Sequence, residues 1–234
     1  MKLTLPLQQI YCVPYSAAKN QKMKVIALEG LIGAGKSFLL KKISALLSDN
    51  TEIKIIEEPV HLFQQFECHN PLALLYSNPY KYAGFAQLHI LRMQASFFRQ
   101  KLDEYADAKV VVTERSLHAP ILFTKSLASM GYISSFERDM LIDEATKNLN
   151  EILPLHPLGG DYVYYLNTPQ QKCLNHIAIR QREQETNMSS LYLDALKEEY
   201  AKYLDKIDKN SLRYLTFGED VKSFADDILK IANY

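Results

Sequence analysis

The residues with the most specific chemistry are residues 30–37, which read GLIGAGKS. Glycines let successive backbone N–H groups point into one concavity, where they can surround a phosphate. The helix that follows adds its positive N-terminal end, a lysine adds a charge, and a serine hydroxyl can bind Mg²⁺. The segment lies between an apolar run and a helical pattern, as this motif requires. It predicts nucleoside triphosphate binding by Gly30, Gly33, Ala34, Gly35, Lys36 and Ser37.

Three further polar segments carry groups suited to phosphoryl transfer. Glu57 and Glu58 end one apolar run, Glu114 and Arg115 end another, and a charged segment at residues 180–185 follows an apolar helical pattern. A carboxylate can accept the proton of an acceptor hydroxyl, a second can hold the metal, and arginines can neutralise the moving phosphoryl group. Each segment alone is also typical of a solvated strand end, a salt bridge or a polar helix face. Their joint occurrence favours transfer.

Short apolar runs alternate with longer helical patterns along the chain, which predicts an α/β fold with a five-stranded parallel sheet and helices on both faces. Ligands of such sheets bind beyond the carboxyl ends of the strands, where the polar segments fall. We predict strands over residues 24–28, 53–57, 110–113, 162–166 and 213–217. We predict helices over residues 36–47, 81–106, 119–130, 135–152, 169–180, 191–207 and 220–232.

Composition limits the partners. The chain has 234 residues and equal numbers, 27 each, of basic and acidic side chains, which argues against binding of nucleic acid polymers or acidic membranes. Its apolar runs are far shorter than a membrane span. Three widely spaced cysteines suit a reducing compartment, so we predict a cytoplasmic protein. Residues 1–22 are predicted to be a flexible extension before a single domain at residues 23–234; the alternative is a mitochondrial transit segment.

Together these motifs resemble the deoxyribonucleoside kinase family, over residues 23 to about 203. The resemblance rests on the phosphate loop, EPV at 58–60, LLYSNPYKYA at 74–83 followed by Gln87, ERS at 114–116 and RxRxxE at 180–185. It implies a P-loop kinase fold with an arginine-bearing lid. It also implies ATP as phosphate donor, Mg²⁺, a deoxynucleoside acceptor phosphorylated on its 5′-hydroxyl, and a role in nucleotide salvage. A homodimer built on the long helix predicted at 81–106 is implied as well.

The resemblance implies roles for the catalytic residues. Glu58 is similar to the base that takes the proton of the 5′-hydroxyl, and Arg115 to the residue that holds that oxygen. Lys36 of the phosphate loop completes this catalytic set. Glu114 is similar to the acid that holds Mg²⁺ together with Ser37.

The acceptor and lid residues follow from the same resemblance. Tyr76 and Glu185 resemble the pair that binds the sugar 3′-hydroxyl, Gln87 the amide that reads a base edge, and Phe63 an aromatic contact to the base. The lid arginines that close over ATP correspond to Arg180 and Arg182.

The sequence departs from the family at several positions. His176 stands where several relatives carry another arginine, so the lid has fewer fixed charges. Gln94 and Pro120 replace an arginine and aspartate pair of the deoxycytidine and deoxyguanosine enzymes. With Ile90 nearby, the pocket is less polar and favours pyrimidine deoxynucleosides, thymidine or deoxycytidine. Phe123 is a candidate for base stacking.

Two other functions remain open from the sequence. A nucleoside monophosphate kinase such as thymidylate kinase would need extra cations for its acceptor's phosphate, and Arg92 and Arg99 are the spare ones in the acceptor region. A non-catalytic scaffold that binds ATP would not need Glu58, Arg115 and the lid arginines together.

Overall fold

A computed structural model describes residues 23–154, 156, 158–182, 185 and 188–233. The predicted extension at residues 1–22 lies outside the described residues, as do four positions of the segment after the lid helix, 183–184 and 186–187. Across the described part of the chain, no helix has the length and apolar character that a membrane crossing demands.

Five parallel strands form one sheet, as predicted, in the order β2-β3-β1-β4-β5. The side chains of the three inner strands are almost all buried because helices cover both faces, whereas the edge strands β2 and β5 are partly exposed. The central strand β1 pairs with β3 and β4, so the phosphate loop that follows it starts in the middle of the sheet. The strands are β1 (Lys24–Glu29), β2 (Ile53–Ile56), β3 (Val110–Glu114), β4 (Tyr162–Leu166) and β5 (Leu212–Leu215).

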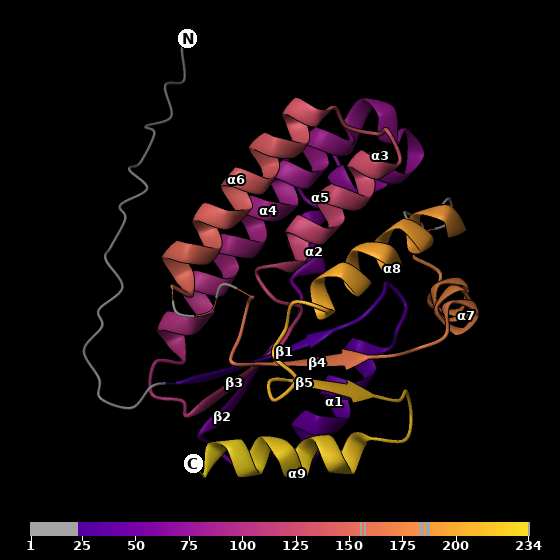
Figure 1. The fold of residues 1–234 in the computed structure, drawn as a ribbon. Helices are drawn as coiled ribbons and strands as arrows, with labels where there is room; N and C mark the ends of the chain where they lie inside the picture. Colours follow the sequence, from indigo (N-terminus) through magenta and orange to yellow (C-terminus); the bar gives the residue numbers. More distant parts are fainter. Residues whose placement is uncertain (1–22, 155, 157, 183–184, 186–187, 234) are drawn as a thin grey trace.

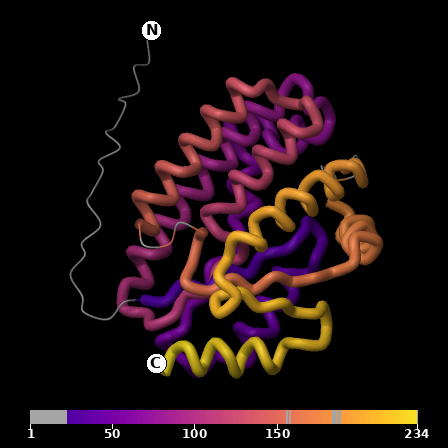
Figure 2. Tube along the Cα trace, viewed as in Figure 1, coloured from indigo at the N-terminus to yellow at the C-terminus, as the bar shows by residue number. Residues whose placement is uncertain are grey.

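Helices lie on both faces of the sheet. Figure 1 shows α1 and α9 together on one face and the long helices α4, α5, α6 and α8 on the other. In Figure 2 the yellow end of the chain returns beside the indigo helix that follows the phosphate loop. The helices are α1 (Lys36–Leu46), α2 (Val60–Phe63), α3 (Pro71–Ser77), α4 (Pro79–Glu104), α5 (Ala119–Ser129), α6 (Ser135–Ile152), α7 (Gln170–Arg180), α8 (Ser190–Leu204) and α9 (Val221–Ala232).

Two short helices were not predicted from the sequence, and some boundaries differ from the prediction. α2 and α3 are too short for a helical period to emerge, although α3 has a clear start: the Asn70 side chain accepts a hydrogen bond from Ala73 N, and Pro71 follows it. α4 begins at Pro79 rather than at 81, since a proline is tolerated in the first turn. The strand predicted at 213–217 ends at Leu215, where its pairing with β4 stops.

Candidate active site

The phosphate loop is closely packed from behind, which explains two of its glycines. Gly33 has φ of 78°, and a Cβ there would lie 2.4 Å from the Cys173 carbonyl oxygen. Gly35 has φ of 99°, and its Cβ would lie 2.2 Å from the Phe217 ring. Contacts this short do not occur between real atoms, so only glycine fits at both positions. The loop therefore keeps its backbone N–H groups in a conformation that other residues could not adopt.

Lys36 is a buried cation with only neutral partners in its own loop. Its Nζ donates to the carbonyl oxygens of Gly30 at 3.2 Å and Leu31 at 3.0 Å. Burial, together with the charge of Arg115, lowers the pKa of Lys36 from 10.5 to about 8, despite the nearby carboxylates. An anionic group near Nζ would supply the compensation that the carbonyls do not.

Ser37 and Glu114 meet at the mouth of the loop. The Ser37 hydroxyl donates to Glu114 Oε1 at 2.8 Å, across 77 residues of sequence. Burial, followed by the charge of Glu58, raises the pKa of Glu114, while Lys36 and the Ser37 hydroxyl lower it. The pair brings together two oxygen ligands of the kind that Mg²⁺ prefers.

Arg115 and Glu58 form an ion pair facing the loop. Arg115 Nε donates to Glu58 Oε1 at 3.0 Å, and Arg115 itself is only 3% exposed. Burial disfavours the charge on Arg115, but Tyr200 and the carboxylates of Glu58 and Glu29 outweigh it, so the pKa of Arg115 is raised above its usual range. Arg115 is therefore a permanent cation beside a half-buried carboxylate.

These groups line one cavity of about 600 Å³. Its other side is formed by the apolar and aromatic side chains of Phe63, Leu72, Tyr76, Ile90 and Phe123. Two buried amides complete this side: Gln87 Nε2 donates to Pro120 O at 3.1 Å, and Gln94 Nε2 donates to Ser116 O at 3.3 Å. The structure thus brings every predicted acceptor residue to the same cavity as the phosphate loop.

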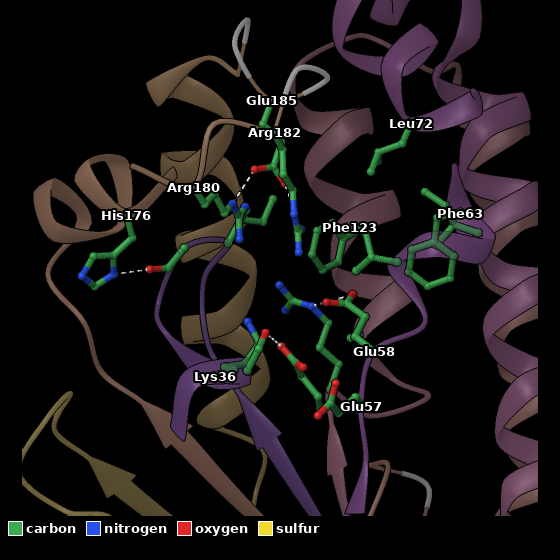
Figure 3. A pocket seen from close by; sticks show the side chains of 18 of the residues that line it. Lys36, Glu57, Glu58, Phe63, Leu72, Phe123, His176, Arg180, Arg182 and Glu185 are labelled. Carbon is green, nitrogen blue, oxygen red and sulfur yellow. Dashed lines mark hydrogen bonds and ion pairs between the residues drawn. The ribbon is translucent and has the colours of Figure 1, made fainter. Parts of the chain in front are cut away.

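The lid residues are paired with one another. Arg180 Nε donates to Glu185 Oε2 at 2.5 Å, and Arg182 Nη1 donates to Glu185 Oε1 at 3.4 Å. Figure 3 shows these three side chains on one side of the cavity and Lys36 on the other. The predicted partner of Glu185, Tyr76, has its ring against Tyr192 at 6.4 Å between centroids. Burial, followed by the Tyr192 and Glu185 side chains, raises the pKa of Tyr76, so its phenol stays protonated.

His176 contacts the phosphate loop directly. Its Nδ1 donates to Gly33 O at 2.7 Å (Figure 3). Its ring centroid lies 4.8 Å from that of Phe217. His176 thus connects α7 to the loop.

Several residues of the site were not predicted from the sequence. Glu29, Tyr200 and Phe217 contact Arg115 or the loop from β1, α8 and the segment after β5. Glu29 had a detectable signal, since it is an acid ending an otherwise apolar strand. Tyr200 had none, because it is one of 15 tyrosines on a helix with an ordinary apolar pattern. The sequence also suggested a salt bridge between Glu114 and Arg115 as an alternative. That is wrong, since Arg115 pairs with Glu58 and Glu114 bonds to Ser37.

The fold and the cavity define an α/β nucleotide-binding protein whose phosphate loop faces an acid–arginine pair. The sequence profile of the deoxynucleoside kinase family matches residues 26–233, and the chain belongs to that family. It is an ATP-dependent enzyme with deoxynucleoside kinase activity, which confirms the class that its motifs resembled.

Its relatives act on different deoxynucleosides. The chain is 26% identical to mitochondrial thymidine kinase 2 of Homo sapiens, over 82% of this chain and 69% of that protein. It is 32% identical to a putative deoxynucleoside kinase of Frog virus 3, isolate Goorha, over 78% and 84% of the two chains. The fold resembles deoxyadenosine kinase from M. mycoides, solved with dCMP and dCDP, with a TM-score of 0.68, 21% identity, and coverage of 89% of this chain and 98% of that one.

The packing behind the loop predicts that Gly33→Ala weakens ATP binding by roughly tenfold or more, because the new Cβ collides with Cys173 O and must displace the loop. Gly131→Ala is the matched control, since Gly131 also has positive φ, 73°, but has nothing within 4 Å of its Cβ. Calorimetric titration with ATP measures both. Equal affinity in the Gly33→Ala variant and the wild type would contradict the packing argument.

Proposed function

We propose that this enzyme transfers the γ-phosphoryl group of ATP to the 5′-hydroxyl of a pyrimidine deoxynucleoside. The observation that carries the proposal is the ion pair of Glu58 and Arg115, which lines the same cavity as Lys36 and Ser37 of the phosphate loop. A phosphate held by the loop would thus meet an acceptor held by the pair, with a carboxylate and a fixed cation beside the reacting oxygen.

In the proposed reaction Glu58 accepts the proton of the 5′-hydroxyl while the hydroxyl oxygen forms a bond to the γ-phosphorus. The bond from that phosphorus to the β–γ bridging oxygen breaks, and ADP leaves with the electron pair. Arg115 holds the attacking oxygen and keeps Glu58 oriented through the 3.0 Å bond. Lys36 neutralises charge on the β- and γ-phosphates, which needs little rearrangement because its Nζ is already fixed within the loop.

Ser37 and Glu114 would hold Mg²⁺. Their hydroxyl and carboxylate oxygens suit this hard cation, and their 2.8 Å contact puts both within reach of one ion. Among the described residues no cluster of three or more His, Cys, Asp and Glu side chains could hold a metal by itself, which fits an ion that takes other ligands from phosphates. When bound, Mg²⁺ would supply positive charge that neutralises the phosphate oxygens.

The remaining residues would bind the sugar, the base and the donor. Tyr76 and Glu185 line the cavity and are proposed to bind the 3′-hydroxyl, the first as a protonated phenol and the second as a carboxylate. Arg180 and Arg182, now held by Glu185, are proposed to neutralise the phosphates of ATP. Residues 23–234 would form this catalytic domain, with Gly30, Gly33, Ala34 and Gly35 as its phosphate cradle.

The lining of the acceptor side supports a pyrimidine. Phe63, Ile90 and Phe123 give flat apolar walls, and Ile90 can accommodate a thymine methyl group. Gln87 has one N–H bonded to Pro120 O, so its second N–H and its oxygen are left to read a base edge. Gln94 is likewise a neutral amide, without the charge of an arginine.

A monophosphate acceptor is less well supported. Arg92 and Arg99 are absent from the cavity lining, and Arg99 pairs instead with Glu151 at 2.9 Å. Of the cations that do line the cavity, Lys36 belongs to the loop, Arg115 to the acid–arginine pair, and Arg180 and Arg182 to the lid, while Lys41 lies on α1.

The acceptor is tested by a radioactive transfer assay with ATP and six candidate acceptors: thymidine, deoxycytidine, deoxyadenosine, deoxyguanosine, thymidine monophosphate and ribothymidine. We expect the largest kcat/KM for one of the two pyrimidine deoxynucleosides, because the cavity walls are apolar and its amides neutral. Preference for a purine deoxynucleoside would reject the pyrimidine assignment, and turnover of the monophosphate alone would reject the acceptor class.

Loss of the proposed base should reduce chemistry and spare ATP binding. We expect Glu58→Gln to lower kcat by roughly 100-fold or more, since the amide cannot take up the proton, with the ATP dissociation constant within about threefold of the wild type. The control is Glu57→Gln, which removes the neighbouring, exposed carboxylate. Turnover by Glu58→Gln equal to that of the control would remove Glu58 from its role.

We also propose a homodimer through α4 and α6. The start of α6 packs on α4 at Gly84, where a Cβ would lie 2.8 Å from Glu137 Oε1. Large apolar side chains near this contact are exposed to solvent. Phe85 is 75% exposed, Phe136 71% and Met140 58%. A second copy of the chain would cover this face.

Sedimentation velocity tests the dimer. We expect the wild type at twice the 26.9 kDa of one chain, and the double variant Phe85→Ser, Phe136→Ser as a monomer. Leu46→Ser is the control, because Leu46 is 60% exposed on α1, on the opposite face of the sheet. A monomeric wild type would overturn the proposal.

A further inference from the structure

We propose that Tyr200 of α8, together with Glu29, is a positioning residue that keeps the guanidinium of Arg115 directed at Glu58. The inference rests on the proposed function, in which Arg115 holds the attacking oxygen. It adds two residues that lie outside the cavity lining and would act only through Arg115.

The contacts form a continuous buried chain. Arg115 Nη1 donates to the Tyr200 hydroxyl at 2.7 Å, and that hydroxyl donates to Glu29 Oε2 at 2.7 Å. The other oxygen of Glu29 accepts from Ser116, from the backbone N at 2.8 Å and from the hydroxyl at 2.6 Å. Glu29 and Tyr200 are both 0% exposed. Glu29 therefore holds α8 through Tyr200 and the end of β3 through Ser116.

This chain determines how the guanidinium lies. Nη1 donates to the Tyr200 hydroxyl and to Gly30 O at 3.0 Å, neither of which belongs to a residue that lines the cavity, while Nε donates to Glu58. Since the guanidinium is planar and rigid, fixing Nη1 and Nε fixes its whole orientation. The backbone needs such support, because Arg115 has φ of 65°, a conformation that costs a large side chain energy and persists only when its surroundings hold it.

The hydroxyl also separates two opposite charges. Arg115 Nη1 lies 3.9 Å from Glu29 Oε2, just beyond hydrogen-bond distance, and Tyr200 bonds to both. Burial raises the pKa of Tyr200 well above its usual range. The phenol therefore stays protonated and donates its hydrogen bond to Glu29. Without the Tyr200 hydroxyl, Glu29 Oε2 would lose its hydrogen-bond donor, and the Arg115 guanidinium already lies 3.9 Å from it. The guanidinium would then turn towards Glu29 and away from Glu58.

The direct test is Tyr200→Phe, which keeps the ring packed against Tyr165 and removes only the hydroxyl. We expect kcat to fall roughly 10- to 100-fold, with the KM for the deoxynucleoside and the dissociation constant of ATP within about threefold of the wild type. The thermal midpoint and circular dichroism report whether the protein remains folded. The matched control is Tyr164→Phe. Tyr164 of β4 is also buried, and its hydroxyl donates to Asp227 of α9 at 3.2 Å.

A second variant separates positioning from general support of the fold. If Glu29 captures Arg115 in the Tyr200→Phe protein, then adding Glu29→Gln removes the attracting charge, while the amide oxygen can still accept from Ser116. We expect this double variant to regain at least about threefold in kcat over Tyr200→Phe. A purely structural network predicts the opposite, because a second buried change would lower kcat further.

The outcomes distinguish this proposal from the proposed function. No turnover by the wild type with any deoxynucleoside would overturn the function itself. Wild-type kcat in folded Tyr200→Phe would overturn only the positioning role, and so would a Tyr200→Phe protein that fails to fold. No gain in the double variant would also count against it.

Discussion

One buried cation organises the active site. Arg115 is almost completely enclosed, and burying a charge is costly unless it is paired and hydrogen-bonded. Here the cost is offset by Glu58, the Gly30 carbonyl and the Tyr200 hydroxyl, with Glu29 behind the tyrosine. These partners come from the segment after β2, from the end of β1 and from α8, while Arg115 itself follows β3. The interactions that offset the cost of burying this charge therefore also hold four separate parts of the chain together.

Sheet topology makes this arrangement possible. β1 and β3 are parallel neighbours in which Leu28 pairs with Glu114, so the residues just beyond the two ends, Gly30 and Arg115, lie side by side. β4 borders β1 on the other side and leads into α7, whose Cys173 carbonyl packs against Gly33. The loop is thus fixed from behind by one neighbour and faces its reaction partners on the other. A parallel sheet brings all of these strand ends to a single edge, as ligand sites of this architecture require.

How much of this the sequence predicts depends on whether a signal is local. Apolar runs predicted the strands, and the unbroken GLIGAGKS motif predicted the phosphate loop, because each signal comes from residues adjacent in the chain. The polar pairs at strand ends located Glu58 and Arg115, since topology brings strand ends together. The bond from Arg115 to Tyr200 across 85 residues, and the link from Tyr200 to Glu29 across 171 residues, have no local pattern. They follow from packing, which one sequence does not encode in its spacing.

The pKa values around the loop differ because the packing gives the buried cations different numbers of opposite charges. Arg115 has carboxylates on two sides, and its pKa is raised. Lys36, equally buried, has carbonyls as its hydrogen-bond partners and Arg115 as a like charge nearby, and its pKa falls to about 8. Glu114 shifts toward its neutral form as well, because burial and Glu58 outweigh Lys36. Of these two buried cations, the less compensated one thus lies inside the phosphate loop, where a polyanion gains most by binding, while the better compensated one stays fixed beside Glu58.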